Sequence, residues 1–345
     1  MKLSLLPLAS LALAQQWPLD SPAEASRIEG IPLLGFGTWN LKTNCSQAVS
    51  QAIQAGYRHI DGAAAYGNEV EVGEGIRDGL KKAGLKREDL WITSKLWNDH
   101  HDPERVELGL NKTLAQLGLS YLDLYHMHWP VGSDSGKNKI NYLETWDAMV
   151  ELKNKGRARH LGVCNFDPKQ LTKLIKHTSE PPAVRKWYSA LSQTVITSNL
   201  ISDQMELHPY LSQEKWIRWH RRNGIHVTAY SPLAGTNPTY SPGLPPRLLN
   251  NTVITRIASE RDCTPAQVAL QWGMARGTSV IPKTSHYSRI VENLHSIECV
   301  LERDDLEDID DLDKAHWRFN NPTVGWGVPL YEGLEDSTGK HKKHS

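Results

Sequence analysis

The sequence has little cysteine: its 345 residues contain four, and no two of them form a CxxC pair. This excludes the ligand spacing of a structural zinc site and offers no disulfide framework. Cys164 and Cys299 lie in apolar stretches, whereas Cys45 and Cys263 flank expected helix starts. We therefore expect buried free thiols and no metal site.

The sequence also lacks net charge, because 39 Lys and Arg residues balance 39 Asp and Glu residues. Proteins that bind nucleic acid through an electrostatic surface carry an excess of basic residues, so that class is disfavoured. Beyond the first 14 residues, no apolar run has the length of a bilayer-spanning helix. The expected partner is a small molecule, with no nucleic acid and no membrane span.

Two common nucleotide-binding motifs are missing. The segment Gly35-Phe36-Gly37-Thr38-Trp39-Asn40 lacks the third glycine of the G-x-G-x-x-G fingerprint. No GxxxxGK[ST] sequence occurs either. If a nucleotide binds, neither a Rossmann turn nor a P-loop holds it.

The chain alternates between strand-like and helix-like stretches. The helix-like stretches carry apolar residues three and four apart, and glycines such as Gly84, Gly118 and Gly156 stand where they should end. This alternation predicts an α/β fold, with a parallel sheet closed into a single (β/α)8 barrel over residues 28–330. The eight strand-like runs are Leu33–Trp39, Tyr57–Gly62, Leu90–Trp97, Leu122–Trp129, Arg159–Asn165, Asp203–His208, His226–Pro232 and Thr278–Lys283.

Three pieces fall outside this alternation. Thr236–Asn251, rich in proline and glycine, predicts a long loop after the seventh strand. A C-terminal arm contains Trp317 and Trp326, and residues 331–345 are expected to form a flexible tail. Arg185–Ser202 interrupts the approach to the sixth strand, and its composition matches neither neighbour.

Two interpretations of Arg185–Ser202 stay open. It is a surface insertion, or it is translated intron. Arg185-Lys186 can be encoded with an internal GTAAG donor, Ser198-Asn199 with a CTAAC branch site, and Ser202-Asp203 with a CAG acceptor, and the excision would keep the frame.

Four chemically active side chains fall at or just after the ends of expected strands. Asp61 closes the second run and Tyr66 follows it, while Lys95 and His128 lie at the ends of the third and fourth. In a parallel barrel, the carboxyl ends of the strands form the face where catalysis occurs. We therefore expect an acid, a phenol, an amine and an imidazole to meet there.

Eight segments together resemble one family, the aldo-keto reductases, over residues 28–330 apart from Arg185–Ser202. The resemblance implies an NADPH-dependent barrel that reduces aldehydes and ketones to alcohols. The segments are Gly30–Trp39, Gly56–Glu69, Ser94–Trp97, His128–Pro130, Gly162–Phe166, Gln204–Tyr210 with Ala229–Leu233, and Ile281–Thr284.

The resemblance assigns roles to the four strand-end residues. Tyr66 would donate the proton, and the nearby Lys95 ammonium would lower the pKa of this weakly acidic phenol. Asp61 would pair with Lys95 and hold it, and His128 would orient the substrate oxygen.

The resemblance also implies the residues that bind NADPH or NADP⁺. Asn165 and Gln204 would grip the nicotinamide amide, and Tyr230 would stack on its ring. Lys283 and Arg289 would favour NADPH over NADH, because a 2′-phosphate needs cationic donors. The remaining candidates are Thr38, Trp39, Cys164, Ser231, Leu233, Thr284, Glu292 and Asn293. Family members usually have serine in place of Cys164 and asparagine in place of Asp203.

Tryptophans are the expected walls of the substrate pocket: Trp39, Trp97, Trp129 and Trp326. They suit aldehydes, including glyceraldehyde and sugar aldehydes, but do not identify one. Two alternatives to an active reductase are a regulatory barrel that binds NADPH without turnover and an inactive product of a retained intron. A monomer or weak dimer is expected.

The first 14 residues predict a signal peptide. Lys2 precedes the apolar run Leu3–Leu13, and Ala12-Leu13-Ala14 has the small-x-small pattern of a cleavage site. In the secretory pathway, the sequons at Asn44, Asn111 and Asn250 would be glycan acceptors. The localisation expected from this leader is secretory or extracellular; the alternative is cytoplasmic, where NADPH is regenerated.

Overall fold

The computed structural model describes residues 27–28, 30–132, 141–179, 200–235, 247–314 and 316–334. The expected signal peptide lies outside these residues, as do most of the Arg185–Ser202 segment and most of the Thr236–Asn251 loop. Among the described helices, none is both long enough and apolar enough to cross a membrane.

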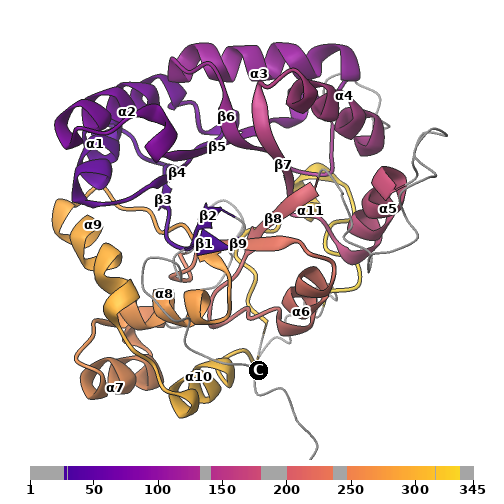
Figure 1. The fold of residues 1–345 in the computed structure, drawn as a ribbon. Coiled ribbons are helices and arrows are strands. Elements are labelled where there is room, and N and C mark those ends of the chain that lie inside the picture. Colours follow the sequence, from indigo (N-terminus) through magenta and orange to yellow (C-terminus); the bar gives the residue numbers. More distant parts are fainter. Residues whose placement is uncertain are drawn as a thin grey trace, which may run out of the picture.

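Eight parallel strands form one sheet in the order β10-β9-β8-β7-β6-β5-β4-β3. The sheet curls around on itself (Figure 1), and a parallel bridge between Leu34 and Val280 joins its two edges. The predicted (β/α)8 barrel is therefore confirmed. The strands are β3 (Phe36–Gly37), β4 (His59–Asp61), β5 (Trp91–Leu96), β6 (Leu122–Met127), β7 (Ala158–Cys164), β8 (Leu200–Glu206), β9 (His226–Tyr230) and β10 (Ser279–Val280). A short antiparallel hairpin, β1 (Arg27–Ile28) and β2 (Ile31–Pro32), precedes them.

The strands of the barrel lie within the predicted runs except β7, which begins one residue early at Ala158, and β8. This strand begins at Leu200, three residues before the predicted start, so Leu200–Ser202 belong to the sheet. Ser202 pairs with Gly162 of β7 and His226 of β9, which places it inside the barrel wall. The unusual segment therefore reaches into the sheet at its C-terminal end.

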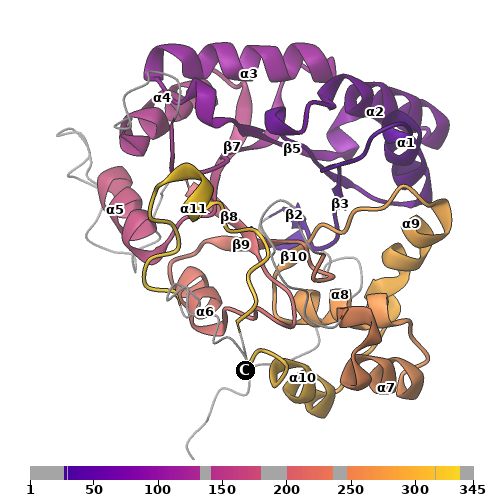
Figure 2. The same cartoon turned by 180° about the vertical axis from the view of Figure 1, so that it is seen from behind.

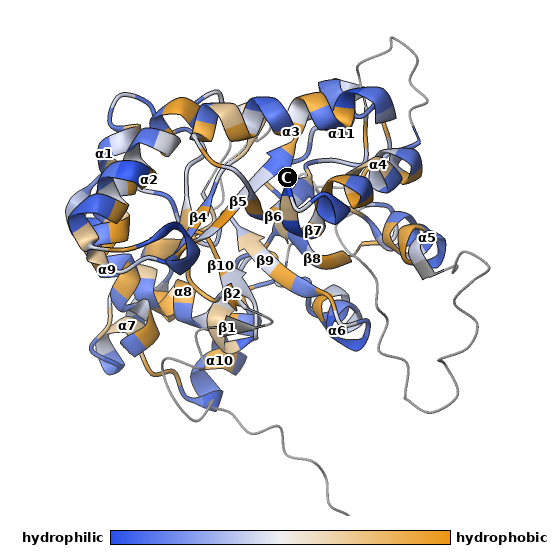
Figure 3. Ribbon diagram, turned by 45° about the horizontal axis from the view of Figure 1, so that its top comes forward, coloured by the Kyte–Doolittle hydropathy of each residue, from blue (hydrophilic) through white to orange (hydrophobic). Residues whose placement is uncertain are grey.

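Helices surround the sheet (Figures 1 and 2), and each carries both hydrophobic and hydrophilic residues (Figure 3). α3 shows why they form where they do: Asp102 caps its first turn by accepting from Glu104 N, and left-handed Gly118 ends it. Its apolar face buries Leu110 and Leu114. The helices are α1 (Cys45–Ala55), α2 (Glu69–Ala83), α3 (Pro103–Leu117), α4 (Tyr142–Asn154), α5 (Pro168–Ser179), α6 (Glu214–Arg222), α7 (Thr252–Glu260), α8 (Pro265–Ala275), α9 (Tyr287–Leu294), α10 (Arg303–Asp310) and α11 (Thr323–Trp326).

The interior of the barrel contains several histidines. His59, His126 and His226 are buried on β4, β6 and β9. The ring of His126 fills the space next to Gly162, where any Cβ atom would clash with it. Neither ring nitrogen of His126 has a hydrogen-bond partner among the described residues. Burial lowers the pKa of His126 well below its ordinary value, so the ring is neutral.

A disulfide joins Cys263, just before α8, to Cys299, just after the 3-10 helix His295–Glu298. The Cα atoms are 5.9 Å apart. The expectation of free thiols is wrong for this pair and holds for Cys45 and Cys164, which are free and buried. The partners are 36 residues apart in sequence, so only the packing of α8 against the end of the α9 region brings them together.

The C-terminal arm crosses the strand ends of the barrel (Figure 2). Two backbone N–H groups of the arm, at Phe319 and Asn320, donate to the buried carboxylate of Glu206 at 2.7 and 2.8 Å. Tyr331 is buried and donates to Asn320 O at 2.9 Å, and Leu334 is also buried. The packed chain therefore extends through Leu334, beyond the expected tail boundary at residue 330.

Candidate active site

The centre of the site is a buried ion pair. Lys95 on β5 donates from Nζ to Asp61 Oδ1 at 2.6 Å and to Gly62 O at 2.8 Å. Lys95 is 0% exposed and Asp61 is 1% exposed. Adjacent parallel strands β4 and β5 place the two residues at the same edge of the sheet. Burial is the largest single influence and disfavours the charged amine, but the charge of Asp61, its hydrogen bond to the amine and the nearby Tyr66 and Cys164 groups together outweigh burial and raise the pKa of Lys95 above its ordinary value.

Tyr66 lies on a 3-10 helix, Ala64–Tyr66, that follows β4. Its hydroxyl accepts from Lys95 Nζ at 3.2 Å. Burial of the phenol raises the pKa of Tyr66 to about 12, although Lys95 acts in the opposite direction. The expected effect of Lys95 thus has the predicted sign, and burial outweighs it. Tyr66 keeps its proton at neutral pH, as a proton donor must.

His128 follows β6 and faces Tyr66. The two rings meet edge to face with centroids 5.8 Å apart, and the ring of Trp97 meets His128 in the same way at 5.1 Å. Burial and the nearby Lys95 charge hold the pKa of His128 well below its usual range. The imidazole is therefore neutral and can donate one hydrogen bond to an oxygen atom.

Gln204 on β8 joins this centre. Its Nε2 donates to the second carboxylate oxygen of Asp61 at 2.7 Å. Asp61 is therefore held through both oxygens, by Lys95 on one side and Gln204 on the other. The sequence motif assigns Gln204 to the nicotinamide but gives no sign of this bond, because Asp61 and Gln204 are 143 residues apart in the sequence.

Asn165 and Tyr230 are connected at the ends of β7 and β9. Tyr230 donates to Asn165 Oδ1 at 2.7 Å, and Asn165 Nδ2 donates to His128 O at 3.1 Å. Asn165 has φ +63° and Ser231, directly after Tyr230, has φ +52°. Non-glycine residues with positive φ are uncommon and concentrate at functional sites. Cys164, beside Asn165, is buried, and burial raises the pKa of its thiol well above the usual value.

The loop after β3 borders the ion pair. Thr38 donates from Oγ1 to Asp61 O at 2.9 Å. Asn68 Nδ2 supports this loop by donating to Thr38 O and Leu41 O at 3.0 and 3.2 Å. Asn68 is a positioning residue that the sequence pattern did not single out.

The residues expected at the adenosine end of the cofactor lie after β10 and on α9. Lys283 and Arg289 are exposed, and neither forms an ion pair with a described residue. Glu292 is half-buried, and Thr284 and Asn293 are buried beside them. Cations without an acidic partner are the side chains that a phosphate group requires. Leu233 and Ser231 lie in the turn after β9 and are half-buried.

Three of the four expected wall tryptophans meet. Trp326 of α11 packs against Trp129 with ring centroids 4.9 Å apart and against Trp97 at 6.2 Å. Trp39 is 44% exposed and makes no ring contact within the described part of the chain. Trp326 comes from the C-terminal arm, which therefore forms one side of this aromatic wall.

Comparison with known proteins agrees with this geometry. A family model described as "Aldo/keto reductase family" matches residues 33–314. The chain belongs to the aldo/keto reductase family. Among its relatives is aldo-keto reductase family 1 member A1 of Cricetulus griseus, 37% identical over 323 residues and covering 88% of this chain and 93% of that protein. A protein of Emericella nidulans named "Probable NAD(P)H-dependent D-xylose reductase" is 39% identical over 324 residues, covering 87% and 95%.

The solved aldose reductase from Schistosoma japonicum has the same fold. Its TM-score is 0.74 at 31% sequence identity, and the match covers 89% of this chain and 96% of that one. This aldo-keto reductase is therefore an NAD(P)H-dependent oxidoreductase that acts on carbonyl groups. The amides of Asn165 and Gln204, the ring of Tyr230 and the two unpaired cations fit such a nicotinamide cofactor.

Proposed function

We propose that this enzyme reduces small aldehydes and ketones, including glyceraldehyde and short sugar aldehydes, with NADPH, and that Tyr66 donates the proton. The contact that supports this most directly is Lys95 Nζ, which lies 2.6 Å from Asp61 Oδ1 and 3.2 Å from the Tyr66 hydroxyl. That position places a permanent positive charge beside a protonated phenol, inside a buried site.

Each residue then has a distinct task. A nicotinamide cofactor held by Asn165, Gln204 and Tyr230 would supply a hydride to the carbonyl carbon, and negative charge would grow on the carbonyl oxygen. Neutral His128 donates a hydrogen bond to that oxygen and orients it, and Tyr66 gives up its proton. Lys95 stabilises the phenolate that remains, because opposite charges attract strongly in a buried site. Asp61, bonded to Lys95 and Gln204, keeps the ammonium in place.

The preference for NADPH rests on Lys283 and Arg289. Both are exposed cations, and no described acidic residue lies within ion-pair distance of either one. A 2′-phosphate would take up these charges, whereas the free ribose hydroxyl of NADH offers no negative charge to either. We assign these two residues to cofactor selection.

The substrate range follows from the walls. Trp97, Trp129 and Trp326 offer flat apolar faces beside His128, which suit the carbon skeleton of a short sugar or polyol aldehyde. The relatives named as D-xylose reductase and aldose reductase support sugar aldehydes as the substrate class.

We further propose that the enzyme is a monomer or weak dimer, which size-exclusion chromatography tests.

The test is the oxidation of NADPH with glyceraldehyde as substrate. Wild-type protein should consume NADPH, and Tyr66→Phe should lose about 10²–10⁴-fold in kcat. The variant should still quench its tryptophan fluorescence on binding NADPH. Binding without turnover in the wild-type protein would contradict the proposal and favour a regulatory barrel.

Absence of binding in the wild-type protein would instead favour an inactive product of a retained intron. In that case Gln204, which lies two residues after Ser202, would be displaced from Asp61. Sequencing the cDNA across Arg185–Ser202 separates these explanations, because a spliced transcript would encode a chain without the segment.

A further inference from the structure

We propose that this chain matures in an oxidising secretory compartment, where Asn44 and Asn250 receive N-linked glycans and Cys263 and Cys299 form their disulfide. The proposal is independent of the reductase activity. It is carried by the places of two sequons on the surface and by the state of all four cysteines.

Asn44 and Asn250 are both presented to solvent. Asn44 lies in the loop before α1 and its side chain makes no capping hydrogen bond. Asn250 ends the 3-10 helix Leu248–Asn250, just before α7. Both residues are exposed, and neither side chain bonds to any described residue. A glycan on either nitrogen would break no contact of the described fold.

The third sequon is less favourable. Asn111 lies within α3 and its Oδ1 accepts from Arg157 at 2.9 Å. Thr113, which completes that sequon, is buried and donates to Glu69 Oε2 at 3.1 Å. Glycan acceptors favour surface loops, so we assign modification to Asn44 and Asn250 alone.

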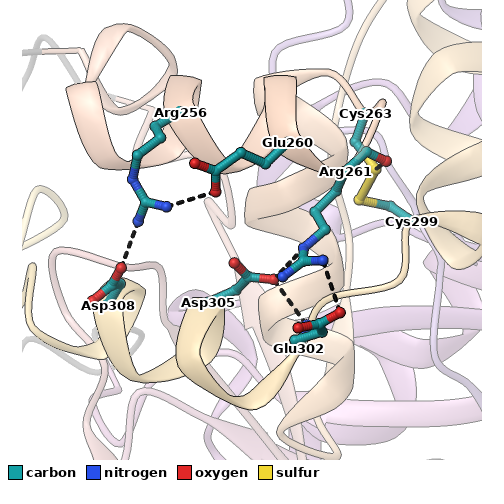
Figure 4. A network of polar contacts seen from close by, with 8 residues as sticks. All are labelled: Arg256, Glu260, Arg261, Cys263, Cys299, Glu302, Asp305 and Asp308. Carbon is teal, nitrogen blue, oxygen red and sulfur yellow. Dashed lines mark hydrogen bonds and ion pairs between the residues drawn. A yellow bond between two sulfur atoms is a disulfide. The ribbon is translucent and has the colours of Figure 1, made fainter.

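The disulfide lies in a junction that other contacts already hold (Figure 4). Arg261, two residues before Cys263, donates to Asp305 Oδ2 at 2.7 Å and to Glu302 Oε1 at 2.8 Å. Glu302 follows Cys299 by three residues, so the same ion pairs bring both cysteines together. Disulfides persist in secretory compartments and are rare in the cytosol, where thiols are kept reduced.

The other two cysteines suit the same surroundings. Cys45 is 2% exposed and Cys164 is 1% exposed, so neither meets an exchange partner. Burial raises the pKa of Cys45 to about 12 and that of Cys164 well above its ordinary value, which keeps both as unreactive thiols. Each cysteine is thus either paired or enclosed.

Each modification needs a co-reactant: a lipid-linked sugar for the asparagines and a protein disulfide for the cysteines. In glycosylation, the Asn Nδ2 atom bonds to C1 of a sugar, the bond from C1 to a lipid-linked pyrophosphate breaks, and the amide loses one proton. In oxidation, the two thiols lose two protons and two electrons to a protein disulfide, which becomes a dithiol.

The test expresses the full chain from Met1 in a yeast host and treats it with peptide N-glycosidase. We expect a gain in gel mobility and conversion of Asn44 and Asn250 to aspartate in the peptide map. Ser46→Ala and Thr252→Ala should each remove one glycan, whereas the matched changes Ser46→Thr and Thr252→Ser keep the sequons and should keep the glycans.

A non-reducing peptide map of the same protein should show Cys263 linked to Cys299. Alkylation after unfolding should label only Cys45 and Cys164. A chain without glycans, or one in which all four cysteines are alkylated, would overturn the proposal. Modification of one asparagine alone would overturn the assignment of the other. Reductase activity is measured separately on the purified protein. If no activity is found, the glycan and disulfide maps can still be interpreted.

Discussion

The candidate catalytic centre and the adenosine side of the barrel hold their charges in opposite ways. Lys95 and Asp61 are almost completely buried, and both Asp61 oxygens are hydrogen-bonded. On the other side, Lys283 and Arg289 are exposed and unpaired within the described ranges. Close to them, the junction of α7, α8 and α10 depends on exposed ion pairs and one disulfide (Figure 4).

This difference matches what each region has to do. The buried pair of Lys95 and Asp61 holds a positive charge in a fixed position beside the Tyr66 hydroxyl. Losing either partner leaves an unpaired charge in the interior. An exposed cation holds its charge at little cost and is available to a ligand that arrives from solvent. Variants should therefore have large effects in the first region and small ones in the second.

The largest effect is expected for Lys95→Met. This change leaves Asp61 buried with only Gln204 as a partner, so the free energy of unfolding should fall by about 3–5 kcal/mol. Turnover should fall by at least about 10²-fold, because Tyr66, the proposed proton donor, loses its stabilising charge. Denaturant unfolding and NADPH oxidation measure the two effects. A variant with wild-type stability would show that the pair is not buried as described.

The second-largest effect is expected from acid, which should destabilise the buried region. Burial lowers the pKa of His59 from 6.5 to about 4, so the unfolded chain binds more protons than the folded one between these values. Stability is fully present above pH 6.5 and is lost as the pH falls toward 4, by about 3 kcal/mol for this residue. Unfolding midpoints across this range measure the slope. Burial also lowers the pKa values of His126, His128 and His226, so His59→Asn should reduce the slope by the share of one residue. A wild-type slope in that variant would contradict the assignment.

Removal of the disulfide should have an intermediate effect. Cys263→Ala should lower the free energy of unfolding by about 2–4 kcal/mol, because the unfolded chain is no longer constrained. The kcat should stay unchanged, since the buried centre lies elsewhere. Gln267 Nε2 still donates to Glu292 O and holds α8 to α9. Cys45→Ala serves as a control that removes a free thiol. A large loss of kcat in Cys263→Ala would show that the disulfide junction affects the buried centre.

Loss of the exposed cations should change cofactor choice more than stability. Arg289→Met should raise the KM for NADPH by about 10-fold, as expected for one charge-assisted contact, while the KM for NADH stays constant. Initial rates with both cofactors make the comparison. An equal rise for both cofactors would show that Arg289 does not contact the 2′-phosphate.

The smallest effect is expected at Arg256, which pairs with Glu260 and Asp308 on the exposed side of α7. Arg256→Met should lower stability by less than about 1 kcal/mol, because exposed ion pairs are screened by water and salt. Thermal unfolding at low and high salt checks this. A larger, salt-independent loss would mean that this junction behaves like the buried centre.

Much of the buried region could be predicted from the sequence. Lys95 and Asp61 are neighbours because parallel strands end at one edge, which is a consequence of topology and needs no side-chain detail. The β5 bounds, Trp91–Leu96, lie within the predicted run Leu90–Trp97. The apolar pattern of the sequence is therefore sufficient to predict where such a strand begins and ends.

Contacts between distant side chains could not be predicted in this way. The Gln204–Asp61 bond and the pairing of Cys263 with Cys299 depend on how side chains point after the helices pack. The start of β8 at Leu200 was also missed, because Leu200–Ser202 carry too short an apolar pattern to stand out from the segment before them. Glu206 was seen only as part of a motif, and its role in binding the arm appears in the fold alone.

The C-terminal arm is attached to the barrel in a way that does not depend on its side chains. The arm meets Glu206 through the backbone N–H groups of Phe319 and Asn320, and backbone groups are the same whatever side chains the arm carries. Trp326 and its neighbours can therefore be exchanged while the anchor persists. Tyr66, Lys95 and His128 all come from the first half of the barrel, so a change in the arm would alter the wall that faces the carbonyl compound and leave these three residues in place.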